Sequence, residues 1–201
     1  MILIVCAVNK ELAFLQPKPH VELLVTGVGP VEAASSVSRA LAQSSYELVI
    51  NAGLGGAIDD IAVGDGVVVS DELLELNLET GLPLSLPPET HVVDRATSDL
   101  NLVDRLVERG FRSVRGITGA RVTASDPTAE RLRSLGVGVE SMEGFAVLRA
   151  AEIAGVPAIE VRGISNVVGD RSRSRWDFEA GVRGLERVST ALLSLLGRND
   201  G

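Results

Sequence analysis

Short apolar runs rich in β-branched residues alternate with segments of helical periodicity along the whole chain. This alternation is typical of βα units, in which strands lie side by side and helices cover the sheet. Strands are predicted at 1–8, 21–26, 48–51, 66–70, 113–118, 137–141 and 158–164. Helices are predicted at 30–41, 98–109, 128–135, 143–154 and 178–196, with Gly110 and Gly155 as left-handed C-caps. We therefore expect one α/β domain over residues 1–197 with a mixed, mostly parallel sheet, followed by a frayed tail at 198–201.

The charge balance and the single cysteine exclude several classes of protein. The 201 residues carry 19 basic and 27 acidic side chains, a formal charge of −8 without a dense basic stretch, which argues against a nucleic-acid partner. The longest apolar run, 1–8, is too short to span a membrane and lacks the features of a signal peptide, so a cytoplasmic location is expected. Cys6 alone allows neither an intramolecular disulfide nor a thiolate metal site, and its apolar surroundings favour a buried small hydrophobe over a nucleophile.

A mean hydropathy of +0.25 in so acidic a chain predicts a homodimer or larger oligomer.

Two glycine-rich segments follow predicted strands. The first, 26–30, joins a strand to a helix as a dinucleotide-binding loop does, but Glu32 replaces the third glycine of that motif and would repel a pyrophosphate. No cofactor is therefore expected there. The second, 51–57, is either a tight turn with glycines at positive φ, or a backbone floor at Gly53, Leu54 and Gly55 on which a flat ligand lies. Its place after a strand favours the floor, because ligands bind beyond the carboxyl ends of strands in α/β sheets.

Three polar residues fall just beyond the ends of predicted strands, namely Glu11, Glu143 and Asn166. Each has an ordinary structural explanation: a solvated residue in the first turn of a helix, a charge at a helix N-terminus and an N-cap, respectively. Strand ends of one sheet can nevertheless bring distant residues to one crevice. We therefore treat the three as candidates for a shared catalytic site.

At these positions the chain resembles a known family. The segments 7–11, 26–34, 51–56 and 67–71, then Glu140-Ser141-Met142-Glu143-Gly144 and Arg162-Gly163-Ile164-Ser165-Asn166, occur in the order found in the nucleoside phosphorylase/nucleosidase superfamily. The similarity spans nearly the whole chain, and the last two stretches are its most specific parts. It implies a three-layer α/β/α domain that binds a small nucleoside, with Ser165 among the binding residues and without a metal or cofactor. It also implies that Glu11 deprotonates a water, Glu143 binds the ribose hydroxyls and Met142 packs under the ribose.

Asn166 and Glu11 bear on which nucleoside is bound and which nucleophile attacks it. By the same resemblance, relatives that release adenine carry Asp where this chain has Asn166. An amide offers one donor and one acceptor together, which match the O6 and N7–H edge of a 6-oxopurine such as hypoxanthine. Glu11 stands where a phosphorylase would bind phosphate beneath the ribose, and its charge favours water as the nucleophile, although Lys10 is adjacent.

The run 167–177 most resembles the futalosine hydrolases of this superfamily, enzymes of the alternative menaquinone pathway. It contains Arg171, Arg173 and Arg175 at alternate positions, followed by Trp176. As a charge run it is equally typical of a solvated loop. Futalosine carries a carboxyphenyl group at the far end of its ribose, which a guanidinium and an indole can bind. Arg173, Arg175 and Trp176 are therefore assigned to the substrate.

The activity expected is hydrolysis of the N-glycosidic bond of futalosine with release of hypoxanthine. Alternatives within the superfamily are a nucleosidase acting on methylthioadenosine or S-adenosylhomocysteine, and a purine nucleoside phosphorylase that depends on phosphate. A non-catalytic nucleoside sensor is an alternative from another class. Glu11 and Glu143 together argue against the sensor, and Asn166 with the arginines argues against the adenine-releasing enzymes.

Overall fold

The computed structural model describes residues 1–16, 18–76, 87, 89–90, 92–170, 172 and 174–197. Within them lie the strands β1 (Ile2–Cys6), β2 (Val21–Val25), β3 (Leu48–Ala57), β4 (Gly66–Leu74), β5 (Arg95–Thr97), β6 (Arg112–Thr118), β7 (Val137–Ser141) and β8 (Ala158–Val167). The helices are α1 (Pro30–Gln43), α2 (Leu100–Val107), α3 (Asp126–Ser134), α4 (Gly144–Ile153) and α5 (Phe178–Leu195), with a short 3₁₀ helix, η1 (Asn9–Leu12). The predicted tail, 198–201, and the side chains of Arg171 and Arg173 lie outside the described residues.

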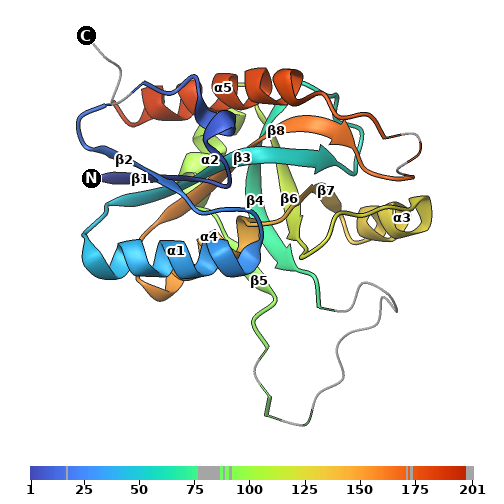
Figure 1. The fold of residues 1–201 in the computed structure, drawn as a ribbon, viewed down its shortest axis with the longest axis horizontal. Helices are drawn as coiled ribbons and strands as arrows, with labels where there is room; N and C mark the ends of the chain where they lie inside the picture. The colour runs from blue at the N-terminus through green and yellow to red at the C-terminus, as the bar shows by residue number, and fades with distance from the viewer. Residues whose placement is uncertain are drawn as a thin grey trace.

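The strands form one mixed sheet in which parallel pairs predominate (Figure 1). The strand order is β2-β1-β3-β7-β6-β4-β5, and β8 pairs with both β3 and β4. The group β2, β1, β3 and β8 is parallel, as is the group β4, β6 and β7. The two groups meet in antiparallel pairs, β4 with β8 and β3 with β7, so the five strands β3, β8, β4, β6 and β7 close into a ring. The expected mixed, mostly parallel sheet is confirmed.

Helices cover both faces of this sheet, which gives the three layers that were expected. β1 is buried along its whole length because its alternate residues face opposite helical layers. Ile2 and Ile4 pack into a core shared with α2 and α5, whereas Leu3 and Val5 pack into a core shared with α1 and α4. Figure 1 shows α5 on one side of the sheet, α1 and α4 on the other, and α3 at the end next to β7. The α/β/α architecture is therefore confirmed.

The predicted elements all occur, but three strands, β3, β4 and β8, run further than the sequence indicated. β3 continues through the glycine-rich segment to Ala57, which excludes the tight-turn interpretation of 51–57. Its glycines have no positive φ. They are required because neighbouring side chains approach the backbone: a Cβ at Gly55 would lie 2.6 Å from Val139 Cγ2, and one at Gly56 equally close to Val168 Cγ2. β8 likewise includes Asn166, which excludes the N-cap interpretation of that residue.

The glycine C-caps agree with the sequence prediction, and one short strand was missed. Gly110 and Gly155 end their helices at positive φ, as predicted, whereas the three-residue strand β5 was not predicted. In the described ranges no helix has both the length and the apolar character needed to cross a membrane. The expected homodimer or larger oligomer stays a prediction.

Candidate active site

A cavity of about 200 Å³ lies where β1, β7 and β8 end. It is lined by Ala7, Val8, Glu11, Val28, Leu54, Gly55, Gly56, Val122, Glu140, Ser141, Met142, Glu143, Ser165, Asn166, Trp176 and Phe178. The structure thus brings together Glu11, Glu143 and Asn166, which are far apart in the sequence. Most of the residues assigned to the substrate also line the cavity, but Gly53 and Arg175 do not.

Glu11 reaches the cavity from η1, immediately after β1. Its carboxylate is buried and accepts three backbone N–H groups: Oε2 accepts from Ala7 and Val8 at 3.0 Å, and Oε1 accepts from Leu54 at 2.9 Å. A carboxylate has about four lone-pair directions, so one acceptor position remains on Oε1. Because the donors are neutral, they fix the orientation of Glu11 without cancelling its charge. Glu11 is therefore not the solvated helix residue that one interpretation of the sequence allowed.

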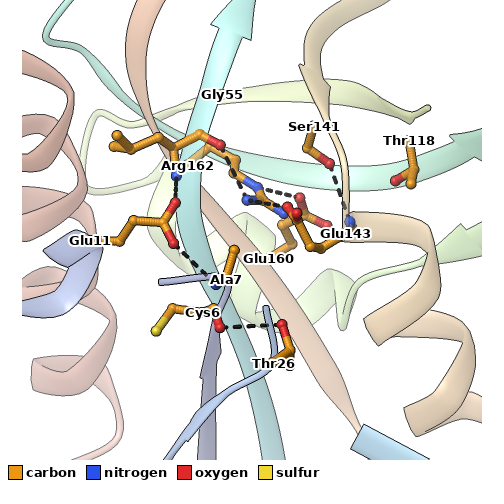
Figure 2. A network of polar contacts seen from close by, with 12 residues as sticks. Cys6, Ala7, Glu11, Thr26, Gly55, Thr118, Ser141, Glu143, Glu160 and Arg162 are labelled. Atoms are coloured by element: carbon orange, nitrogen blue, oxygen red, sulfur yellow. Dashed lines mark hydrogen bonds and ion pairs between the residues drawn. The ribbon is translucent and has the colours of Figure 1, made fainter. Parts of the chain in front are cut away.

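Glu143 is the residue before α4, but its carboxylate does not cap that helix. The hydroxyl of Ser141 takes this place and accepts from the backbone N–H of Gly144 at 3.2 Å. Glu143 turns instead to the loop before α1, where Oε1 accepts from the Gly29 N–H at 2.9 Å. The other oxygen, Oε2, lies 3.8 Å from Nη1 of Arg162. Figure 2 shows the Arg162 guanidinium directed toward Glu143.

Asn166 lies in β8 and is held by its neighbour. The Ser165 hydroxyl donates to Oδ1 of Asn166 at 2.9 Å and lies 3.3 Å from the Gly55 carbonyl oxygen. Asn166 is only 3% exposed, so a ligand that meets this amide does so in a water-poor environment. The arrangement presents an amide, with both donor and acceptor capacity, at a wall of the cavity.

Glu140 lines the same cavity and was not singled out in the sequence. Burial raises the pKa of its carboxyl and the charge of Glu75 adds to the shift, while the hydrogen bonds from Thr123 oppose it. The backbone N–H of Thr123 donates to both oxygens, at 3.0 and 3.1 Å, and its hydroxyl also donates to Oε1. Glu140 is the first residue of the recognised stretch 140–144, which is the signal that was available.

Arg162 is the residue that sequence reasoning missed most clearly. It was part of a recognised stretch, but no role was assigned to it. Arg162 is 1% exposed, and its guanidinium donates from Nε to Glu160 Oε1 at 2.7 Å and from Nη1 to the Leu54 carbonyl at 3.2 Å. Burial lowers the pKa of Arg162, but the charges of Glu160 and Glu143 outweigh this effect and raise it. The signal in the sequence is the pair Glu160 and Arg162, which stand at alternate positions in the otherwise apolar strand predicted at 158–164.

Gly53 explains how Arg162 and Glu11 come so close to each other. A Cβ at Gly53 would lie 2.4 Å from Arg162 Nη1 and 3.1 Å from Glu11 Oε1. Only a glycine leaves room for both side chains against β3. Gly53 therefore contributes to the site from behind the cavity, by admitting the guanidinium, rather than as a floor under a ligand.

The arginine series is only partly described. Trp176 lines the cavity and is 56% exposed, so its indole stands at the mouth. Arg175 lines a neighbouring cavity of about 630 Å³ together with Val167 and Asp170. Arg173 lies outside the described residues. Among the residues that are described, no group of three or more His, Cys, Asp or Glu side chains is placed to hold a metal ion.

Comparison with known proteins places this architecture and sequence in one family. The model of the Phosphorylase superfamily matches residues 12–198, and the chain belongs to that superfamily. It is 36% identical over 176 residues to a futalosine hydrolase of Streptomyces coelicolor, covering 77% of this chain and 71% of the relative. It is 32% identical over 180 residues to a futalosine hydrolase of Thermus thermophilus, covering 85% of this chain and 80% of that one.

Solved structures show the same fold. The 5'-methylthioadenosine/S-adenosylhomocysteine nucleosidase of S. pneumoniae, determined with a transition-state inhibitor, superimposes with a TM-score of 0.81. The match covers 97% of this chain and 99% of that one at 23% identity. At this level of identity the likeness concerns the fold.

Cys6 lies behind the site, and its environment predicts low reactivity. Burial, with the charge of Glu11 adding to it, raises the pKa of the thiol to about 12, and the residue is 1% exposed. Because the thiolate is the reactive form, we expect the native protein to resist iodoacetamide at mildly alkaline pH and to be alkylated once unfolded in guanidinium. Intact-mass spectrometry would measure both. Alkylation of the folded protein at the rate of a free thiol would contradict the burial of Cys6.

Proposed function

We propose that this protein hydrolyses the N-glycosidic bond of a purine nucleoside, with futalosine as the substrate and hypoxanthine as the base released. The observation that carries the proposal is the convergence of Glu11, Glu143 and Asn166 on one cavity. Cleavage of this bond creates positive charge on the ribose and negative charge on the departing base. A site for it must activate a nucleophile, stabilise the cationic sugar and bind the leaving purine.

Glu11 is suited to orient and deprotonate a water. Its three backbone donors leave one acceptor position on Oε1, and the same oxygen lies against Gly53, where Arg162 approaches. A water held at that position loses a proton to Glu11 as it attacks the anomeric carbon. Correct placement of the base matters as much as its basicity, and the fixed carboxylate supplies this placement.

Glu143 is suited to bind the ribose and to stabilise its positive charge. Gly29 and Arg162 hold the carboxylate from behind, on the side away from the cavity. The remaining acceptor positions are available to ribose hydroxyls, and its negative charge favours an oxocarbenium-like transition state. Met142, the preceding residue, supplies an apolar surface in the same cavity wall.

The charge of the cavity favours water over phosphate as the nucleophile. Among the described lining residues there is no Lys or Arg, whereas three are glutamates, Glu11, Glu140 and Glu143. A phosphate dianion needs cationic or N–H donors, and it would be repelled by the carboxylates. Lys10, the neighbour of Glu11, is exposed and does not line the cavity.

The choice of futalosine rests on Asn166, on Trp176 and on the named relatives. The Asn166 amide matches the O6 and N7–H edge of hypoxanthine, and Trp176 at the cavity mouth offers a surface on which an aryl group can stack. Two relatives at 36% and 32% identity are futalosine hydrolases. That Arg173 or Arg175 pairs with the substrate carboxylate stays a prediction, and Arg175 lines a different cavity from Trp176.

A product assay tests the proposed function directly. The purified protein is incubated with futalosine, inosine and methylthioadenosine, each with and without inorganic phosphate, and free bases are separated by chromatography. We expect phosphate-independent release of hypoxanthine from futalosine and little release of adenine. Strict dependence on phosphate would indicate a phosphorylase, and faster release of adenine would indicate a methylthioadenosine-type nucleosidase.

Replacing either cavity carboxylate should remove most activity without unfolding the protein. Glu11→Gln removes the base, and Glu143→Gln removes a charge opposite the cationic sugar. Loss of a general base typically lowers the rate by about 10²–10⁴-fold, so kcat should fall by a similar factor. The matched control is Glu179→Gln, because the Glu179 side chain is 90% exposed on α5. Turnover close to that of the parent in either cavity variant would remove the residue from the mechanism.

Asn166→Asp should shift the preference from 6-oxopurines toward 6-aminopurines. A protonated carboxyl donates to N7 but cannot serve the protonated N7 and O6 edge of hypoxanthine as an amide does. A mispaired buried polar group costs about 1–3 kcal/mol, so the ratio of kcat/KM for inosine and adenosine should change roughly ten- to a hundredfold. An unchanged ratio would mean that Asn166 does not contact the base.

A further inference from the structure

Glu72 on β4 and Glu160 on β8 lie behind the site, and the proposed mechanism uses neither of them. Both are 0% exposed. Glu160 accepts from Arg162 through Oε1, and Glu72 accepts from the Thr118 hydroxyl through Oε2 at 2.7 Å. Their second oxygens, Glu72 Oε1 and Glu160 Oε2, have no hydrogen-bond partner. Buried acceptors without a partner are costly, so this pair needs a physical explanation.

The two unpartnered oxygens face the same point. A Cβ at Gly144 would lie 2.5 Å from Glu72 Oε1 and 2.6 Å from Glu160 Oε2. Glu72 Oε1 also lies against Gly116, where a Cβ would be 2.0 Å away. Two ionised carboxylates cannot satisfy each other because both are acceptors only. One proton between them turns the same arrangement into a hydrogen bond.

The surrounding groups determine which carboxyl carries that proton. Among the described residues, the charged groups that face Glu72 are Glu160 and Arg162 of β8. The Thr118 hydroxyl faces it from β6, and α4 contributes backbone at Gly144. Arg95 of β5 and Arg115 of β6 bind Asp71 instead, at 2.9 and 2.8 Å. Glu160 accepts a charged hydrogen bond from the Arg162 guanidinium, whereas Glu72 has only the neutral Thr118 hydroxyl as a donor.

We propose that Glu72 is a neutral acid that donates a hydrogen bond to Glu160, and that this bond holds Glu160 and Arg162 in the arrangement that positions Glu143. Glu72 is thus a positioning residue, which acts through Arg162 and touches no substrate. Burial and the Glu160 charge raise the pKa of Glu72 well above the ordinary carboxyl value, which agrees with this assignment. Ionisation of Glu72 would add a second negative charge beside Glu160 and draw Arg162 away from Glu143.

The protonation state can be tested without any substrate. The infrared carbonyl band of a protonated carboxylic acid is expected at neutral pH in the parent protein and is expected to be missing in Glu72→Gln. Glutamine is the matched variant because its amide accepts from Thr118 and donates to Glu160 as the neutral acid does. If the spectra of the two proteins show no such difference, or if Glu72→Gln fails to fold, the proposal is wrong.

Stability provides a second measurement that is independent of activity. Because the pKa of Glu72 is higher in the folded than in the unfolded protein, its stabilising contribution is present at low pH and is lost as pH rises toward the folded value. The urea midpoint of the parent should therefore fall with pH relative to that of Glu72→Gln. Glu72→Met, which has a similar size but no donor, should have a lower midpoint than Glu72→Gln. A parent and Gln variant with parallel pH profiles would contradict the proposal.

The effect on turnover rests on the proposed function, but the two measurements above do not. Above the pKa of Glu72 the kcat of the parent should fall about tenfold per pH unit, because only the protonated fraction is competent. The ratio of kcat for Glu72→Gln to kcat for the parent should therefore rise with pH, since every other ionisable side chain is present in both proteins. If this kcat ratio is constant with pH in proteins that show the infrared difference, Glu72 is still a neutral acid but it does not position Arg162 and Glu143, and the positioning role is overturned.

Discussion

The buried guanidinium of Arg162 is the interaction on which the rest of the site depends. A cation that is 1% exposed must be neutralised inside the protein, because its hydration has been lost. Glu160, Glu143 and the Leu54 carbonyl perform this task from three different segments. Removing one partner from such a buried pair typically costs about 3–5 kcal/mol. The contacts that position Glu143 for a ligand are therefore the same contacts that stabilise the junction of β3, β8 and α4.

Much of the fold could be predicted because strands and helices that form the layers each leave a local pattern in the sequence. The apolar run at β1 is uninterrupted since both faces of that strand are buried, and α2 and α4 end at glycines with positive φ. The three polar residues at the cavity were also found, because ligand sites in α/β sheets lie beyond the carboxyl ends of strands. Their positions after predicted strands, joined to the family resemblance, were enough to place Glu11, Glu143 and Asn166 together.

The rest could not be predicted because it depends on what lies beside each residue in space. A glycine that permits a turn and a glycine that admits a neighbouring side chain look the same in a sequence. Gly53, Gly116 and Gly144 belong to the second kind, and each borders Arg162 or Glu72. The buried charges come from β4, β8 and the start of α4, so no local pattern joins them. A strand as short as β5 leaves no periodicity to detect.

The way in which each carboxylate is held determines what the cavity can do. Glu11 accepts hydrogen bonds from three neutral N–H groups, whereas Glu143 forms an ion pair with the Arg162 guanidinium 3.8 Å away. The described lining of the cavity has three glutamates and no lysine or arginine, so under the proposed function negative charge lies beneath the ribose. Such a charge favours a developing oxocarbenium ion and disfavours a phosphate dianion. In a fold that is shared across the superfamily, the choice between water and phosphate follows from this electrostatic balance rather than from the architecture.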